Sequence, residues 1–141
     1  MDKHLPIESL SPQSLELLYS IAYSHVVGAR FQEAEKLFYS LVIHAPENVK
    51  FWKALAHVQQ KLLKYDEAWA TYALVSNLSP EDPEPYLRAA ECYFADGKVT
   101  DGLDALKEVE HRIQNAPKYQ VELTRLQQAW QKKKPSRKPC K

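Results

Sequence analysis

Histidine and cysteine are the side chains of this sequence best suited to catalysis or metal binding, and neither occurs in a pattern that supports them. No two histidines are four residues apart, and none has metal-ligand spacing to a cysteine. The sequence also lacks a nucleophile elbow and a glycine-rich phosphate loop. We therefore expect no catalytic residue, no metal and no other cofactor, so that the protein acts by binding. The residues considered are His4, His25, His44, His57, His111, Cys92 and Cys140.

A different regularity runs through the chain, which repeats itself every 34 residues. Pro46 and Pro80 are one period apart, and small residues recur with the same step at Ala34, Ala68 and Gly102. Small residues, aromatic residues and a closing proline at this period are typical of a tetratricopeptide array. Because the helical hairpins of such an array stack into an extended concave surface, the pattern favours a binding protein. Four further sets share the step, namely Leu18/Trp52/Tyr86, Ala22/Ala56/Ala90, Phe31/Tyr65/Val99 and Phe38/Tyr72/Leu106.

Composition favours one helical domain. The 141 residues are 45% hydrophobic and 26% charged, with only 3 Gly. No run approaches the roughly 18 apolar residues of a membrane span, and the first residues lack the apolar core of a signal peptide. Two distant cysteines imply no disulfide framework. We expect a cytoplasmic protein without direct membrane insertion.

Charge is distributed unevenly. The last ten residues, 132–141, contain six Lys or Arg and no acid. Subtracting these from the 19 basic residues of the chain leaves 13 against 18 acidic residues, so the body carries a net charge near −5. An acidic body argues against nucleic-acid binding. The basic tail is either a solvated end or a site of weak electrostatic contact with an acidic partner.

The expected fold is all-α, with three tandem helical hairpins and a C-terminal capping helix. Ser11 and Pro12 suit the start of the first helix. Near the other end, an amphipathic stripe that includes Leu123 and Trp130 suits a helix that covers the last repeat. The expected segments are a flexible leader (1–10), three repeats within 11–115 (about 15–48, 49–82 and 83–114), the capping helix (116–132) and a basic disordered tail (133–141).

The first helix of each repeat is expected to line the concave groove. An apolar strip of Tyr19, Tyr23 and Val26 is predicted there, with Leu87 and Phe94 facing it across the middle repeat. Exposed apolar surface in a concavity indicates a ligand, another chain or the protein's own terminus. The predicted binding residues are Tyr19, Tyr23, Val26, Lys50, Lys53, His57, Gln60, Lys61, Leu87, Glu91 and Phe94.

One use of such a groove is disfavoured by the sequence. Tetratricopeptide domains that clamp the C-terminal carboxylate of heat-shock chaperones supply Lys, Asn and Arg donors from three helices. Here Tyr19 and Tyr23 occupy the first helix, and Ala54 stands at the second-helix Asn position. Only Arg88 fits, so the charge-assisted donors that a carboxylate needs are absent.

The stretch from about Ser11 to Gln128 resembles the class II chaperones of bacterial type III secretion, the SycD/LcrH/IpgC group that guards hydrophobic translocators. The resemblance is strongest in residues 15–38 and 62–106, and the segment 89–92 followed by Gly97 is more specific than a generic repeat. It implies a bacterial cytoplasmic chaperone whose groove holds a short extended segment of a secreted partner. The family's groove aromatics match Tyr19 and Tyr23, whereas Val26 stands where an aromatic residue is common.

The leading hypothesis is therefore a chaperone that holds a secreted translocator before export. Alternatives are a chaperone for an effector or an apparatus subunit, and a tetratricopeptide scaffold or regulatory adaptor. Homodimerisation is left open.

Overall fold

The computed structural model describes residues 10–131, which form seven α-helices, two short 3₁₀ turns and no strand. The predicted all-α class, with three hairpins followed by a last helix, is confirmed. The predicted leader, apart from Leu10, and the basic tail lie outside the described residues. The helices are α1 (Pro12–Val27), α2 (Phe31–His44), α3 (Val49–Lys61), α4 (Tyr65–Leu78), α5 (Glu84–Ala95), α6 (Val99–Arg112) and α7 (Gln120–Gln131), and the 3₁₀ turns span Ile113–Asn115 and Pro117–Tyr119.

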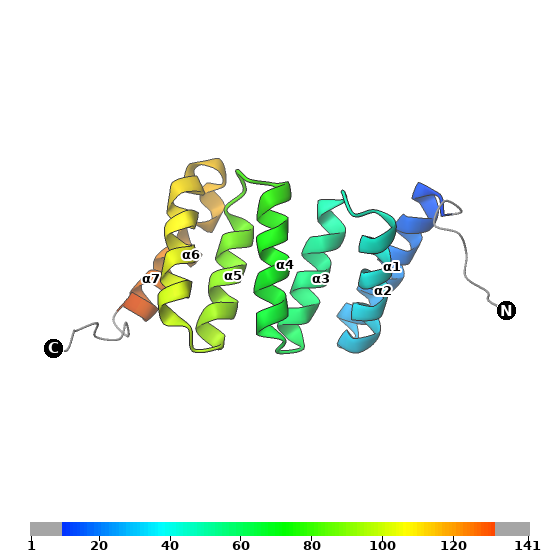
Figure 1. Ribbon diagram of the computed structural model, residues 1–141, viewed down its shortest axis with the longest axis horizontal. Helices are drawn as coiled ribbons and strands as arrows, with labels where there is room; N and C mark the ends of the chain where they lie inside the picture. The colour runs from blue at the N-terminus through cyan, green and yellow to red at the C-terminus, as the bar shows by residue number, and fades with distance from the viewer. Residues whose placement is uncertain (1–9, 132–141) are drawn as a thin grey trace.

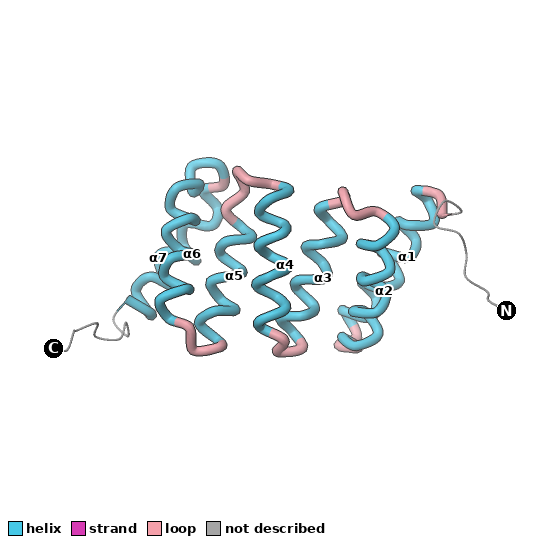
Figure 2. The backbone as a smooth tube through the Cα atoms, viewed as in Figure 1, coloured by secondary structure: helices cyan, strands magenta, loops and turns pink. Residues whose placement is uncertain are grey.

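The helices stand side by side in one row, as Figure 1 shows. Each helix packs against the next along the chain, so α1/α2, α3/α4 and α5/α6 form three hairpins, and α7 follows at the end of the row. Short loops join the helices (Figure 2). As in other solenoids, each hairpin contacts only its neighbours, and the concave surface is built from several repeats together.

The turns inside the three hairpins share one backbone geometry. Ala29, Leu63 and Gly97 are 34 residues apart and adopt left-handed φ angles of 60°, 63° and 80°. In each turn the backbone N–H of the residue after the left-handed one donates a hydrogen bond to the carbonyl five residues before it, at N···O distances of 2.8 to 2.9 Å. This bond closes the end of the first helix of the hairpin. In the first turn Ala29, and not the neighbouring Gly28, takes the left-handed position.

Glycine at position 63 should stabilise the fold. A left-handed conformation costs a residue with a Cβ about 1–2 kcal/mol, and glycine removes this cost. Glycine also destabilises the fold by about 0.5–1 kcal/mol, because its backbone loses more conformational freedom on folding. Leu63 is 67% exposed, so its removal loses little packing. We expect Leu63→Gly to raise the free energy of unfolding in urea by about 0.5–1 kcal/mol, the difference between these two effects. A lower value than that of the parent protein would contradict this assignment of strain.

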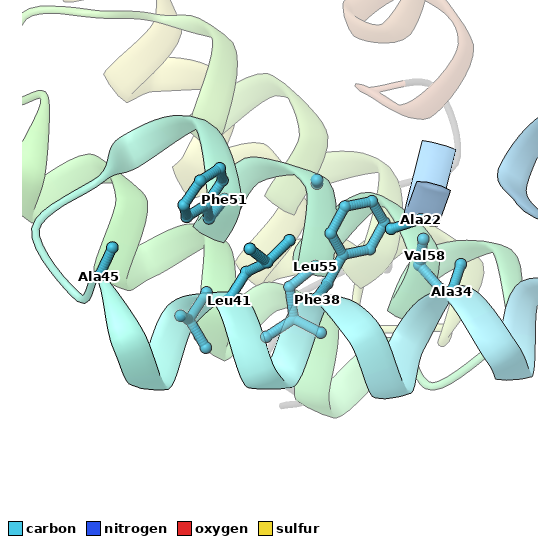
Figure 3. Packing of buried hydrophobic residues seen from close by; sticks show 10 residues of the cluster. Ala22, Ala34, Phe38, Leu41, Ala45, Phe51, Leu55 and Val58 are labelled. Atoms are coloured by element: carbon cyan, nitrogen blue, oxygen red, sulfur yellow. The ribbon is translucent and has the colours of Figure 1, made fainter. Parts of the chain in front are cut away.

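Small residues let the paired helices approach closely. Ala22, Ala56 and Ala90 are fully buried on the first helices of the hairpins, in three successive repeats. At Gly102 on α6 an added Cβ would lie 2.3 Å from the ring of Phe94 on α5, so only glycine fits there without movement. Aromatic and aliphatic side chains fill the space between repeats, as Figure 3 shows for the first two hairpins.

The end of the array is covered by α7. Leu123 is buried in the cluster of the third hairpin, and the indole of Trp130 stacks on Phe94 with 4.7 Å between ring centroids. The packing role predicted for Trp130 is confirmed. Residues 117–119, expected to be part of this helix, form a 3₁₀ turn instead.

Two further features bear on function. None of the helices within residues 10–131 combines the length and apolar character needed to cross a membrane. Cys92 is a free and fully buried thiol, and burial together with the charge of Glu91 raises its pKa to about 12. A thiol of this kind is unreactive.

Candidate binding groove

The first helices of the three hairpins, α1, α3 and α5, line a cavity of about 500 Å³. Tyr72 of α4, which is largely buried, also lines this cavity. The cavity is partly open to solvent, and its volume lies within the usual range of ligand-binding pockets. Its walls are formed by Tyr19, Tyr23, Val49, Lys50, Lys53, Ala54, His57, Glu84, Pro85 and Arg88.

One wall of the cavity is aromatic. The rings of Tyr19 and Tyr23 lie one helical turn apart, with 5.1 Å between their centroids. Tyr19 also packs on Phe51 and Phe38, at 5.5 and 5.9 Å, and is therefore part of the core as well as of the groove. Burial, and then the neighbouring Tyr23, raise the pKa of Tyr19, so its phenol stays protonated. Among the aromatic residues that line this cavity, Tyr23, which is 38% exposed, has the most surface available to a ligand.

The lysines of the groove are already paired with carboxylates. Lys50 Nζ lies 3.0 Å from Glu16 on the preceding repeat and 4.5 Å from the centroid of the Tyr19 ring. Lys53 Nζ lies 2.9 Å from Glu84 on the following repeat and 3.1 Å from Asp82 in the loop that leads to it. Burial alone would lower the pKa of Lys53, but the hydrogen bonds and charges of these two carboxylates raise it. These lysines therefore join repeats and present their remaining donors to the groove.

Arg88 is the central cation of the far wall. Its guanidinium lies 2.9 Å from Glu91 on the same helix and 3.3 Å from Glu122 on α7, with Glu84 at 3.7 Å. Although burial opposes the charge, these carboxylates raise the pKa of Arg88. The one donor that matched a carboxylate clamp is thus neutralised from three sides, which agrees with the sequence argument against that mode.

The groove continues past His57 into a second cavity of about 580 Å³. Gln60, Lys61 and Glu91 line this second cavity, and His57, Glu84 and Arg88 line both. Burial, followed by the positive charges of Lys61 and Arg88, lowers the pKa of His57. The imidazole is therefore neutral at pH 7 and offers one hydrogen-bond donor and one acceptor to a ligand.

Mild acid should destabilise the fold in part through His57. Unfolded His57 has a pKa near 6.5 and folded His57 a lower one, so between the two values the unfolded chain binds more protons. The free energy of unfolding therefore falls as the pH drops between these two pKa values. Above the unfolded pKa of His57, this residue makes no contribution to the pH dependence. In His57→Gln we expect a shallower dependence of the unfolding free energy on pH between about 5 and 7. The same slope in both proteins would contradict this prediction.

The structure brings together most of the residues predicted for the site. Tyr19, Tyr23, Lys50, Lys53 and His57 line the first cavity, and Gln60, Lys61 and Glu91 line the second with His57. Val26 lines neither cavity and packs against the core of the first hairpin.

The placement of Leu87 and Phe94 in the open groove is wrong. Leu87 is 0% and Phe94 is 4% exposed, and both belong to the core cluster that includes Leu123 of α7. The cause is the last helix, which lies against the third hairpin and covers the positions that are open in earlier repeats. The wall opposite the tyrosines is therefore formed by Glu84, Pro85 and Arg88 rather than by an apolar strip.

Several lining residues were not among those predicted. Tyr72 follows the packing period and also reaches the cavity, and Ala54 leaves space for it. Glu84 also lines the cavity, and its charge follows the period: Glu16, Lys50 and Glu84 occupy equivalent positions with alternating sign. Such alternation predicts ion pairs between successive repeats, of which Lys50 with Glu16 is one.

Three comparisons place this geometry among known proteins. No family model matches the chain. Low calcium response locus protein H of Yersinia pseudotuberculosis serotype I (strain IP32953) is 24% identical over 120 residues, which are 85% of this chain and 71% of that protein. The resemblance to class II type III secretion chaperones is confirmed.

Solved structures agree with this relationship at the level of the fold. The Yersinia enterocolitica type III secretion chaperone SycD, in complex with a peptide of the translocator YopD, superposes with a TM-score of 0.81 at 24% identity, over 89% of this chain and 98% of that one. PcrH, a Pseudomonas aeruginosa protein, was solved in complex with the chaperone-binding region of PopD. It gives a TM-score of 0.83 at 19% identity, over 90% of this chain and 98% of that one.

Proposed function

We propose that this protein is a chaperone of type III secretion in the bacterial cytoplasm, and that it binds an extended segment of a secreted translocator. The observation that carries the proposal is the groove itself: an aromatic wall at Tyr19 and Tyr23 faces a polar wall on α5, in a fold shared with a chaperone solved with a translocator peptide. Bound in this way, the client segment is shielded from aggregation and from premature partners. The mechanism needs no nucleotide and no chemical step.

The two walls of the groove contribute differently to binding. Apolar client side chains, of which proline and leucine are the expected kinds, would pack against Tyr23 and the exposed edge of Tyr19. Each such side chain contributes roughly 1.5–3 kcal/mol before the cost of ordering the segment. The polar side chains beyond them, His57 and Gln60, would hydrogen-bond the client backbone, which an extended segment leaves unpaired.

Burial in the groove needs several contacts in a row. A dissociation constant of 1 μM corresponds to about −8 kcal/mol, so at roughly 1.5–3 kcal/mol each, two or three apolar anchors do not reach it alone once the cost of ordering the segment is subtracted, and further contacts along the groove are needed. The continuous path from the first cavity to the second past His57 provides room for such a series.

Co-purification tests the proposal. The tagged wild-type chain and Tyr23→Ala are purified from the native cytoplasm under identical conditions, and circular dichroism verifies that both are folded. We expect the wild type to retain one abundant protein with long apolar segments, and the variant to lose most of it. Retention of the same folded, soluble proteins by both would contradict the proposal and favour a scaffold or adaptor.

The same experiment separates the classes of client. A translocator carries segments able to insert into membranes, whereas an effector or an apparatus subunit does not, so the sequence of the retained protein decides among them. The mass of the purified complex decides whether the chaperone acts as a monomer or as a homodimer.

A further inference from the structure

We call the groove of α1, α3 and α5 the client groove. A second groove, formed by α4, α5 and α6, adjoins it. It has a volume of about 260 Å³, and Tyr72 and Pro85 form the partition between the two, since both line each of them. Its aromatic residues are Trp69, Tyr86 and Tyr93, with Trp69 and Tyr93 stacked at 4.5 Å between centroids. Three carboxylates of α6 stand along its edge, and we call it the acidic–aromatic groove. These carboxylates are Asp101, Asp104 and Glu108.

Two of the three carboxylates are not neutralised. Glu108 lies 2.8 Å from Arg112, whose guanidinium also covers the Tyr86 ring at 4.3 Å. Asp101 and Asp104, by contrast, form no ion pair or hydrogen bond with any residue in the described part of the chain. Lys98 Nζ lies over the ring of Trp69, 5.8 Å from its centroid. Aromatic faces beside unpaired carboxylates suit a cationic ligand, through both ion pairing and cation–π contact.

The last residue that the structure describes lines a cavity next to this groove. A neighbouring cavity between α6 and α7 is lined by Asp104, Lys107, Glu110 and Gln131, the last described residue. Asp104 thus lines both the groove and the cavity that Gln131 lines. Packed helices have axes about 8–10 Å apart, a span that three or four extended residues of about 3.3–3.6 Å each can cross.

We propose that residues 132–141 of the same chain dock in the acidic–aromatic groove. Six of these ten residues are Lys or Arg, and the body that they meet is acidic. Pro135 and Pro139 favour an extended polyproline conformation, which aromatic-lined grooves bind at low entropic cost. The first lysines reach Asp104 and Asp101, and Arg137 with Lys138 then reach the stacked rings of Trp69 and Tyr93. The client groove stays free, so this contact does not depend on the proposed function.

Spin labelling of the full chain tests the proposal, because its two cysteines differ sharply. Cys92 is buried with its pKa raised to about 12, so a nitroxide reagent added to the folded protein attaches to Cys140 in the tail. We expect the label to broaden the indole N–H signal of Trp69 strongly at low salt, and to broaden that of Trp52, which lies on α3 and does not line the acidic–aromatic groove, much less. The broadening should weaken in 0.5 M salt, where the Debye length falls to roughly 4 Å.

Amide variants decide whether the two carboxylates hold the tail. Asp101→Asn with Asp104→Asn keeps the shape of the groove and removes its free charge, so Trp69 broadening should fall to the level of Trp52. Glu33→Gln with Glu47→Gln, on exposed residues of the first repeat, is the matched control and should change nothing. Equal signals from Trp69 and Trp52 in the labelled wild type would overturn the proposal. Broadening that the Asn variant leaves intact would overturn it as well.

A mixing experiment establishes that the tail and the groove belong to one chain. Isotope-labelled protein without nitroxide is combined with unlabelled protein that carries it. We expect no broadening of Trp69 in the mixture. Broadening in the mixture would mean that the groove receives the tail of a second copy, which contradicts docking within one chain.

Discussion

Alanine in place of Tyr23 should weaken binding of the client segment about 5- to 30-fold. Tyr23 is the groove aromatic with the larger free surface, 38% of the side chain, and a bound client would cover it. Losing the contact costs about 1–2 kcal/mol, which corresponds to this range of dissociation constants. Titration calorimetry with the chaperone-binding segment of the co-purified client measures the change. Tyr19 is less suitable: both tyrosines contact Phe38, but the ring of Tyr19 packs on Phe51 as well, so its removal would disturb the core more.

Tyr39→Ala is the matched control for this measurement. Tyr39 lies on α2, is 40% exposed and lines neither cavity of the groove. The control should therefore bind the client with the affinity of the wild type. If Tyr39→Ala weakened binding as much as Tyr23→Ala does, the client would have to contact the second helices of the hairpins, and the placement of the site would be wrong.

Alanine in place of Leu87 should destabilise the protein without altering the groove. Leu87 is fully buried beneath α7, and truncation of a buried leucine costs about 2–5 kcal/mol. That is a large part of the roughly 5–15 kcal/mol by which domains are stable. Urea unfolding should show this loss, while the folded variant should bind its client normally because Leu87 does not line the cavity.

Leu17→Ala provides the comparison for Leu87. Leu17 lies on α1 and is 62% exposed, so its truncation should change the unfolding free energy by no more than about 0.5 kcal/mol. The opposite pattern for Leu87, unchanged stability with weaker client binding, would contradict its burial and would return it to the groove.

The repeat made most of the fold predictable. A 34-residue step places Ala22, Ala56 and Ala90 at equivalent packing positions, and the structure buries all three completely. Helix boundaries followed from local signals as well: the Ser11 side chain caps α1 by accepting a hydrogen bond from the Ser14 N–H. These features depend on residues near one another in sequence or one period apart, which is why sequence alone was sufficient.

The groove was less predictable at its far end, for a physical reason. Leu87 and Lys53 occupy equivalent positions in successive repeats, yet Lys53 lines the groove and Leu87 is buried. Only the last repeat lies under α7, so equivalence by period fails where the array ends. The ion pairs of Lys53 with Asp82 and Glu84 also depend on contacts between helices, and the sequence shows these charges without showing that they are partners.

Site-specific photocrosslinking tests the central claim, that an extended client segment lies in the groove formed by α1, α3 and α5. A photoreactive amino acid is placed at position 57, between the two cavities, and in a second protein at position 77, an exposed site on α4. Each protein is irradiated with the client identified by co-purification, and the crosslinked client peptide is read by mass spectrometry. We predict one short client segment crosslinked from position 57 and none from position 77. Client crosslinks from position 77 without any from position 57 would contradict the account.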